Sequence, residues 1–243
     1  SNFTSAVTTN LILQHGDRLV CYEVTKAGKL LFEFDVRLSG RPEAICSFRP
    51  KSGYETSQDH LALLFRDAHY ISVLKYDAEI GDVLTCGEQQ LIHMDDPVAF
   101  PAPGAFKPQL VEDPEHRCIA ARVLLDRIAV MPTSGAGWTH MKSEVVAAQE
   151  NSLANHQVGS HTSGLTSPFM VHTGTAPMRL HHVEDCTFMH GYSQPVLACI
   201  GKVHPSWGAC ISPCNQNNTS VLLVLLDLTK QTPHLVWAIH ELP

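Results

Sequence analysis

The chain has 243 residues, of which 44% are hydrophobic and 17% are charged, as expected for a globular protein with a sizeable core. The net charge of −7 and the lack of any Lys/Arg cluster argue against a general phosphate-binding surface. The longest unbroken apolar run, Val221 to Leu226, is too short to span a bilayer, and no signal peptide is recognisable. The eight cysteines are scattered, so we expect free thiols in a reducing compartment.

The first part of the chain predicts short strands separated by turns. Residues 11–24 have the pattern of a hairpin, and residues 43–48 that of a buried strand. Residues 29–36 alternate between apolar and polar side chains and predict a half-buried strand. The alternation places four apolar side chains on one face: Leu30, Phe32, Phe34 and Val36.

Two further hairpins are predicted, over residues 61–76 and 118–131. The three hairpins recur at a spacing of roughly 50 residues, which is typical of the short-stranded blades of a β-propeller. The Trp-Asp and Gly-His signatures of ordinary WD repeats are missing at the expected places. Periodicity alone therefore also permits a β-sandwich or a large barrel.

Two stretches interrupt this pattern. Five prolines between residues 97 and 114 argue against a central strand and predict an extended surface connection. Residues 133–178 are dominated by Gly, Ser, Thr, His and Ala, and only residues 142–149 have the pattern of a short helix. We expect most of this stretch to be a mobile insertion, because it buries too little apolar surface to offset its ordering entropy.

The last part of the chain again predicts strands, with long apolar runs over residues 220–228 and 234–239. Trp237 lies inside the second run and is expected in the core. The chain thus divides into early propeller blades over residues 1–132, the insertion over 133–178, and further blade sequence over 179–243.

The histidines and cysteines raise the hypothesis of a metal site. His181, His182, Cys186 and His190 lie within ten residues, and Cys210 and Cys214 are four apart. Zinc ligands are usually spaced as two C-x-x-C pairs or as such a pair with H-x-x-x-H, and neighbouring His181 and His182 would point to opposite faces of a strand. We therefore predict no metal ligands, and keep a His/Cys metal-dependent enzyme as a remote alternative.

Catalytic and cofactor motifs are also missing. The chain has no G-x-S-x-G elbow, and no activating neighbour of its cysteines is recognisable in the sequence. The glycines at 135 and 137 lack the remaining residues of a phosphate-binding loop, and Asp95-Asp96 before a proline indicates a turn. We predict no catalytic residue, no cofactor and no small-molecule substrate.

Several segments resemble one family. Phe188-Met189-His190-Gly191-Tyr192 with Gln194-Pro195-Val196-Leu197, and Leu225 to Thr229 with His234-Leu235-Val236-Trp237, are similar to the first β-propeller of the large subunit of cleavage and polyadenylation specificity factor. Three earlier stretches agree in order and approximate spacing: Asn10 to Val24, Asp59 to Asp77, and Asp113-Pro114 through Arg117-Cys118-Ile119-Ala120 to Met131-Pro132. The family is related to the large subunit of the damaged-DNA-binding protein and to the large propeller subunit of splicing factor 3b.

The resemblance implies an all-β, WD40-like, seven-bladed propeller, of which this chain supplies a partial ring of about four blades. It implies a nuclear, non-catalytic scaffold in pre-mRNA 3′-end cleavage and polyadenylation. The implied partners are a WD-repeat subunit, a zinc-finger subunit, the endonuclease and poly(A) polymerase, with pre-mRNA contacted indirectly or weakly and no membrane. A ubiquitin-ligase adaptor or a splicing-factor subunit of the same superfamily is the nearer alternative.

The resemblance does not identify which residues bind the partners. A partial ring exposes strand edges and an apolar blade face. We therefore expect the chain alone to be poorly soluble or to self-associate.

Overall fold

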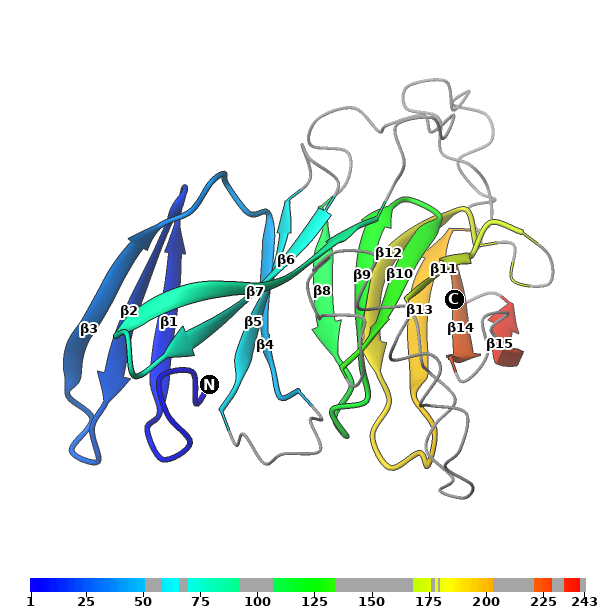
Figure 1. The fold of residues 1–243 in the computed structure, drawn as a ribbon. Coiled ribbons are helices and arrows are strands. Elements are labelled where there is room, and N and C mark those ends of the chain that lie inside the picture. The colour runs from blue at the N-terminus through cyan, green and yellow to red at the C-terminus, as the bar shows by residue number, and fades with distance from the viewer. Residues whose placement is uncertain are drawn as a thin grey trace, which may run out of the picture.

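The computed structural model describes residues 1–50, 58–65, 70–91, 107–133, 168–175, 178, 180–202, 221–228 and 234–240. These residues form strands and turns, with no helix among them. None of the described segments is therefore a helix that could cross a membrane. The strands make four antiparallel sheets arranged side by side in chain order (Figure 1).

Each sheet is a meander, in which consecutive strands are hydrogen-bonded neighbours. The first sheet contains β1 (Asn10–His15), β2 (Arg18–Val24) and β3 (Leu30–Arg37). The second contains β4 (Ala44–Phe48), β5 (His60–Phe65), β6 (Tyr70–Asp77) and β7 (Asp82–Gln90). The third contains β8 (Gln109–Glu112), β9 (Cys118–Leu124), β10 (Arg127–Pro132) and β11 (Phe169–His172). The fourth contains β12 (His182–Phe188), β13 (Val196–Lys202), β14 (Val221–Asp227) and β15 (His234–His240).

The sheets are arranged as the blades of a partial β-propeller. The first strand of the third sheet, β8, packs against the first strands of both neighbouring sheets, β4 and β12. The first strands of the second, third and fourth sheets therefore lie next to one another on the inner side, and none of the four sheets closes into a barrel. This arrangement confirms the propeller prediction over the sandwich and the barrel, and we call the sheets blades one to four.

The predicted hairpins are present as β1–β2, β5–β6 and β9–β10. The β1–β2 turn contains Gly16 at φ 62°, a conformation that glycine adopts without a steric cost. The apolar runs near the C-terminal end form β14 and β15, as predicted. The side chain of Trp237 is not among the described side chains. The helix predicted over residues 142–149 lies outside the described residues.

The third blade is buried on both of its faces. All seven residues of β9 are buried, and successive side chains belong to different apolar clusters. Cys118 and Ala120 pack toward the fourth blade, whereas Ile119 and Ala121 pack toward the second. Because strand side chains alternate between faces, a blade covered on both sides needs apolar side chains at successive positions, and β9 has them everywhere except at the buried Arg122.

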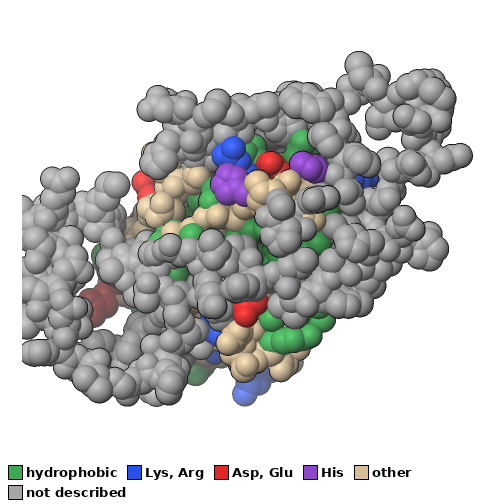
Figure 2. All heavy atoms as spheres, turned by 90° about the vertical axis from the view of Figure 1, so that its right-hand side faces the viewer, with side chains coloured by type: hydrophobic (Ala, Val, Ile, Leu, Met, Phe, Trp, Pro, Cys, Tyr) green, Lys and Arg blue, Asp and Glu red, His purple; other side chains and the backbone are tan. Residues whose placement is uncertain are grey.

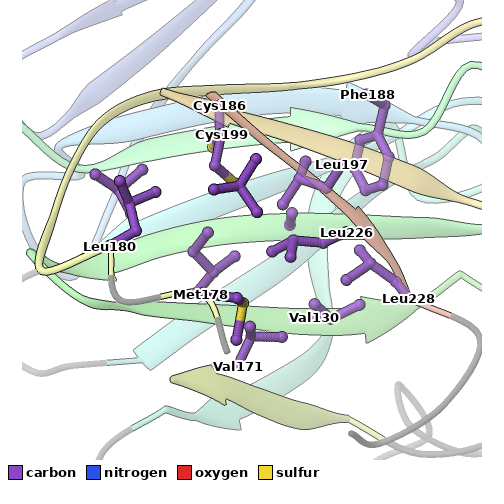
Figure 3. Packing of buried hydrophobic residues seen from close by; sticks show 14 of the residues in the cluster. Val130, Val171, Met178, Leu180, Cys186, Phe188, Leu197, Cys199, Leu226 and Leu228 are labelled. Atoms are coloured by element: carbon purple, nitrogen blue, oxygen red, sulfur yellow. The ribbon is translucent and has the colours of Figure 1, made fainter. Parts of the chain in front are cut away.

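The largest cluster lies between the third and fourth blades, where side chains from β9 to β14 meet (Figure 3). Most of its members are inaccessible to solvent, including Ile128, Leu180, Leu197 and Leu226. Each such aliphatic side chain contributes about 1.5–3 kcal/mol by burial, which makes this cluster a principal source of cohesion between the two blades.

The second blade repeats the two-faced pattern. On β5, Ala62 and Leu64 face the third blade, whereas Leu61 and Leu63 join the cluster toward the first blade. That last cluster also contains Phe3 from the segment before β1. All three neighbouring pairs of blades are therefore held together by apolar sheet faces.

The first blade departs from the predicted alternation. In the pairing of β2 with β3, Cys21 lies opposite Phe34, but the next residue, Tyr22, lies opposite Phe32, so Glu33 forms a β-bulge. The extra residue reverses the faces on either side of it. The prediction that Leu30, Phe32, Phe34 and Val36 share one face is therefore wrong: Phe34 and Val36 pack toward blade two, while Leu30 and Phe32 are 51% and 62% exposed.

The proline-rich stretch also differs from its prediction. Residues 92–106 lie outside the described residues, but Gln109–Glu112 forms β8, the inner strand of the third blade. Pro108 precedes this strand and is buried. The prediction of a surface connection is wrong for residues 109–112, because the prolines flank a four-residue strand and none lies inside it.

The end of the 133–178 stretch belongs to the third blade. Phe169–His172 forms β11 and pairs with β10, and Val171 and Met178 are buried in the cluster between blades three and four. Residues 134–167 lie outside the described residues. A strand of only four residues carries a weak sequence signal, which explains why composition alone did not identify it.

A second bulge lies in β12, where Val183 pairs with Gly201 but Asp185 pairs with Ile200. The bulge brings β12 very close to Gly201. A Cβ atom at position 201 would collide with the backbone carbonyl oxygen of His182 and lie 2.9 Å from the Val183 Cα. Only glycine fits this position without a backbone shift.

We expect Gly201→Ala to lower the free energy of unfolding by about 3 kcal/mol, because the clash is with backbone rather than with a flexible side chain. Urea denaturation of the purified chain measures this loss. Gly40→Ala is the control, since a Cβ there would meet only the Phe65 ring at 3.4 Å, and we expect a change within about 0.5 kcal/mol. Equal stability of the two variants would contradict the close approach at the bulge.

Candidate functional site

A series of polar contacts connects the first three blades. The backbone N–H of Asn2, ahead of β1, donates to the Asp59 carboxylate before β5 at 2.7 Å. Asp59 also accepts two hydrogen bonds from the Arg49 guanidinium at 3.0 and 3.1 Å. The backbone N–H of Arg49 donates to Glu112 in β8 at 3.0 Å, and Glu112 contacts His116 Nδ1 at 2.6 Å. These contacts fix the loops after β4 and β8 relative to each other.

A buried ion pair continues the series into the fourth blade. The Arg117 guanidinium donates to both carboxylate oxygens of Asp113, at 2.6 and 2.8 Å, and the Asp113 side chain is fully buried. The remaining Arg117 nitrogen, Nη1, donates to the backbone carbonyl of Tyr192 at 3.0 Å. Tyr192 lies in the turn between β12 and β13, so this arginine joins the third blade to the fourth.

The same contact brings together two stretches that carry the family resemblance. Asp113 and Arg117 belong to one of them, and the His190-Gly191-Tyr192 turn belongs to the other. Sequence reasoning identified both stretches but did not predict their contact. The available signal was the pairing of a carboxylate with an arginine four residues later, just before an apolar strand.

Arg122 makes a second connection between blades three and four. Its guanidinium donates to the backbone carbonyls of Val183, at 2.7 Å, and of Glu184, which form the β12 bulge. Beside it, Gln109 donates to the Asp185 carboxylate at 2.7 Å and to the carbonyl of Cys186. Burial lowers the pKa of Arg122 from its ordinary value. Its buried charge is stabilised by the carbonyl dipoles of Val183 and Glu184 at the bulge.

The residues considered for a metal site do not form one among the described residues. His181 precedes β12, His182 begins it, Cys186 is buried within it, and His190 lies in the exposed turn that follows. Within the described part of the chain, no three His, Cys, Asp or Glu side chains are grouped to hold an ion. Cys210 and Cys214 lie outside the described residues, as do Asp95-Asp96 and the glycines at 135 and 137.

His60 and Cys86 form a contact that sequence reasoning missed. His60 begins β5 and Cys86 lies in β7, with β6 between these two strands in the sheet. The Cys86 sulfur lies 3.7 Å from His60 Nδ1. Burial lowers the pKa of His60 to about 4 and raises the pKa of Cys86 to about 11. A nucleophilic thiolate–imidazolium pair requires shifts in the opposite directions. Both groups are therefore neutral at pH 7, which is the chemistry of a packed core pair.

The other described cysteines are also unreactive in their surroundings. All six described cysteines are free, and burial raises the pKa of the Cys21 thiol to about 11 and of the Cys46 thiol to about 12. Cys186 and Cys199 lie opposite each other in β12 and β13, and burial raises the pKa of each thiol. Thiols with raised pKa values are poor nucleophiles and behave as small apolar side chains.

Three curated proteins are similar to this chain over most of its length. The chain is 27% identical over 215 residues to cleavage and polyadenylation specificity factor subunit 1 of Arabidopsis thaliana, covering 85% of this chain and 14% of that protein. It is 23% identical over 184 residues to Protein cft1 of Schizosaccharomyces pombe, covering 75% of this chain and 12% of that protein. It is 26% identical over 219 residues to probable cleavage and polyadenylation specificity factor subunit 1 of Oryza sativa subsp. japonica, covering 85% and 14%.

These similarities confirm the resemblance that the motifs predicted. The chain spans about one seventh of the length of these curated relatives. No protein-family model matches the chain.

We expect Arg117→Met to lower the free energy of unfolding by about 3–5 kcal/mol, because it leaves the Asp113 carboxylate buried without its counter-charge. Urea denaturation at pH 7 measures the loss. Arg18→Met is the matched control, since Arg18 also binds a carboxylate through two nitrogens, that of Asp35, but its side chain is 48% exposed. A loss for Arg117→Met no larger than that for Arg18→Met would contradict the structural importance of the buried pair.

We expect acid to destabilise the chain through His60. Between the ordinary imidazole pKa of 6.5 and about 4, the unfolded chain binds a proton at His60 that the folded chain does not, so stability falls as the pH falls through this window. The His60 contribution is roughly 2 kcal/mol after allowance for its partial exposure.

Urea midpoints of the chain and of His60→Gln at pH 7.5 and pH 4.5 measure this effect. Carboxylate titrations are common to both proteins and cancel in the difference. The variant should lose less stability on acidification, and an identical loss in both proteins would show that His60 is not held neutral.

Proposed function

Because this chain is related to the large subunits of cleavage and polyadenylation specificity factor, we propose that it forms part of a non-catalytic scaffold in nuclear mRNA 3′-end processing. In this role the propeller blades hold other subunits in register while those subunits recognise the polyadenylation signal and cut and extend the RNA. The names of the relatives support the process, and the propeller fold supports a role in protein–protein contact.

The observation that carries the proposal is the contact between Arg117 and Tyr192. It joins two of the stretches in which the chain resembles the family, and in this structure both of them help to align the third and fourth blades. The buried, two-pronged ion pair with Asp113 holds the Arg117 guanidinium in one orientation, so that its remaining nitrogen positions the Tyr192 turn of the fourth blade. Rigid spacing of blades is what a scaffold requires.

The charge distribution supports indirect rather than direct contact with RNA. A protein that binds the phosphate backbone strongly needs clustered Lys and Arg, and this chain carries a net charge of −7. Figure 2 shows the face at the fourth blade, where the described basic, acidic, histidine and apolar side chains are interspersed. We propose that signal recognition belongs to other subunits, with pre-mRNA touched weakly or not at all by this chain.

The proposed partners are a WD-repeat subunit, a zinc-finger subunit, the endonuclease and poly(A) polymerase. We further propose that residues 1–132 and 179–243 supply blades of one propeller and that the intervening stretch, 133–178, is largely an insertion. The ordered strand Phe169–His172 at the end of that stretch is then the point where the insertion returns to the third blade.

The alternative within the same superfamily is an adaptor in a ubiquitin ligase or a splicing-factor complex. The propeller fold supports that alternative equally well, and the names of the relatives favour polyadenylation. The enzyme alternative draws no support from the His60–Cys86 contact, in which both groups are neutral at pH 7.

Affinity purification of the tagged protein that contains this chain from nuclear extract, followed by mass spectrometry, tests the proposal. We expect the polyadenylation endonuclease, a zinc-finger subunit and a WD-repeat subunit to be enriched over an unrelated propeller used as bait. Enrichment of a cullin or of splicing-factor subunits in their place would keep the fold and overturn the assigned process.

A further inference from the structure

Three exposed side chains in two neighbouring turns take no part in holding the fold together. The turns are residues 113–117, between β8 and β9, and residues 189–195, between β12 and β13. Tyr192 is 41% exposed, and Glu115 and His190 are exposed as well. Within the described part of the chain, none of these three side chains forms a hydrogen bond or an ion pair. They are therefore free to contact another molecule.

The two turns lie side by side at one end of blades three and four (Figure 1). Each follows the first strand of its blade, and these first strands, β8 and β12, pack against each other. Arg117, at the end of the first turn, donates to the backbone carbonyl of Tyr192 in the second at 3.0 Å. The pKa of Arg117 is raised mainly by its hydrogen bonds to Asp113, and the negative charge of Glu115 contributes to the shift. Glu115 therefore lies near the guanidinium that holds the Tyr192 turn.

Both turns are ordered before any other molecule binds. In the first turn, the His116 N–H donates to the Asp113 carbonyl at 2.8 Å. In the second, the Met189 N–H donates to the Val196 carbonyl at 2.9 Å. Arg117 then fixes the second turn to the first. Side chains on such a pre-ordered backbone lose less conformational entropy on binding than side chains on a mobile loop.

The uncompensated charge beside Tyr192 is negative. Asp113 and Arg117 neutralise each other in their buried ion pair. Glu115 makes no ion pair with any residue that the structure describes, and residues 189–195 include no Lys, Arg, Asp or Glu. An exposed carboxylate repels the phosphates of RNA and attracts a cationic side chain. The charge therefore favours a protein partner over RNA at this place.

A tyrosine ring near a carboxylate suits an arginine side chain. The planar guanidinium group stacks on an aromatic face and donates hydrogen bonds to a carboxylate at the same time. A lysine ammonium group offers only a compact point charge. Tyrosine and arginine are also among the residue types that contribute most of the binding energy at protein–protein interfaces.

We propose that the turns at Glu115 and Tyr192 form a docking point for an arginine of a partner subunit, whose guanidinium group lies against the Tyr192 ring and pairs with the Glu115 carboxylate. This inference rests on the proposed scaffold function and adds the place on blades three and four where one partner is held. Arg117 is a positioning residue in this arrangement, because it binds the Tyr192 carbonyl rather than the partner.

Substitutions at the two turns test the docking point in the tagged protein that contains this chain. Tyr192→Ala removes the ring and Tyr192→Phe keeps it, and both leave the backbone carbonyl that Arg117 binds. Each variant is purified from nuclear extract and its partners are quantified by mass spectrometry. We expect Tyr192→Ala to lower the recovery of one polyadenylation subunit by at least roughly tenfold. Glu115→Gln should lower the same subunit about threefold, and Tyr192→Phe should leave it nearly unchanged.

Ile80→Ala is the matched control, since Ile80 is 65% exposed in the turn between β6 and β7, outside both docking turns. It should leave every subunit in place. Equal urea midpoints of the purified chain with and without each substitution control for folding. Full recovery of every subunit by Tyr192→Ala would overturn the docking point while the proposed function stands. Failure of the unchanged protein to recover any polyadenylation subunit would overturn both.

Photocrosslinking identifies the occupant directly. The photoreactive amino acid benzoylphenylalanine replaces Tyr192 in the same tagged protein, and mass spectrometry identifies the crosslinked segment. We expect an arginine-containing peptide of the subunit that Tyr192→Ala loses, and substitution of that arginine by alanine should cause the same loss. A crosslink to RNA, to a second copy of the protein or to another segment of the same polypeptide would contradict the proposal.

Discussion

The structure depends on one constraint: a propeller blade is apolar on both faces, so each face must be covered by another blade. Strand β9 shows this most clearly, because its successive side chains enter two different apolar clusters. Blades two and three satisfy the constraint on both sides within this chain. Among the described residues, blade one satisfies it only toward blade two, and Leu30 and Phe32 are exposed on its other face. The same rule thus explains which blades are held together and where apolar side chains stay exposed.

Apolar packing brings the blades together, and polar contacts determine how they are aligned. Arg117 holds the turn at Tyr192 through a backbone carbonyl, and Arg122 holds the carbonyls of the β12 bulge. Both guanidinium groups are buried and already donate to groups of this chain, so neither arginine is available for catalysis or for binding RNA. The described thiols are free and their pKa values are raised where a shift is resolved. These observations together support the proposed scaffold role in 3′-end processing.

Sequence patterns predicted the hairpins β1–β2, β5–β6 and β9–β10 because each combines two apolar runs with a short turn. They failed at Glu33, since a bulge adds one residue and reverses the alternation without any local signal. They also failed at β8 and β11, four-residue strands whose pairing depends on distant neighbours. The Asp113–Arg117 pair was visible in the sequence, but its bond to Tyr192 spans 75 residues and required the fold.

Hydrogen exchange followed by mass spectrometry on the purified chain tests most directly whether two-sided covering governs this fold. Backbone amides in β9 and β10, which are covered on both faces, should exchange most slowly, and those in β3 should exchange fastest among the strands of the first three blades. Protection of β3 equal to that of β9 would contradict the account, since it would mean that stability does not follow from the covering of blade faces.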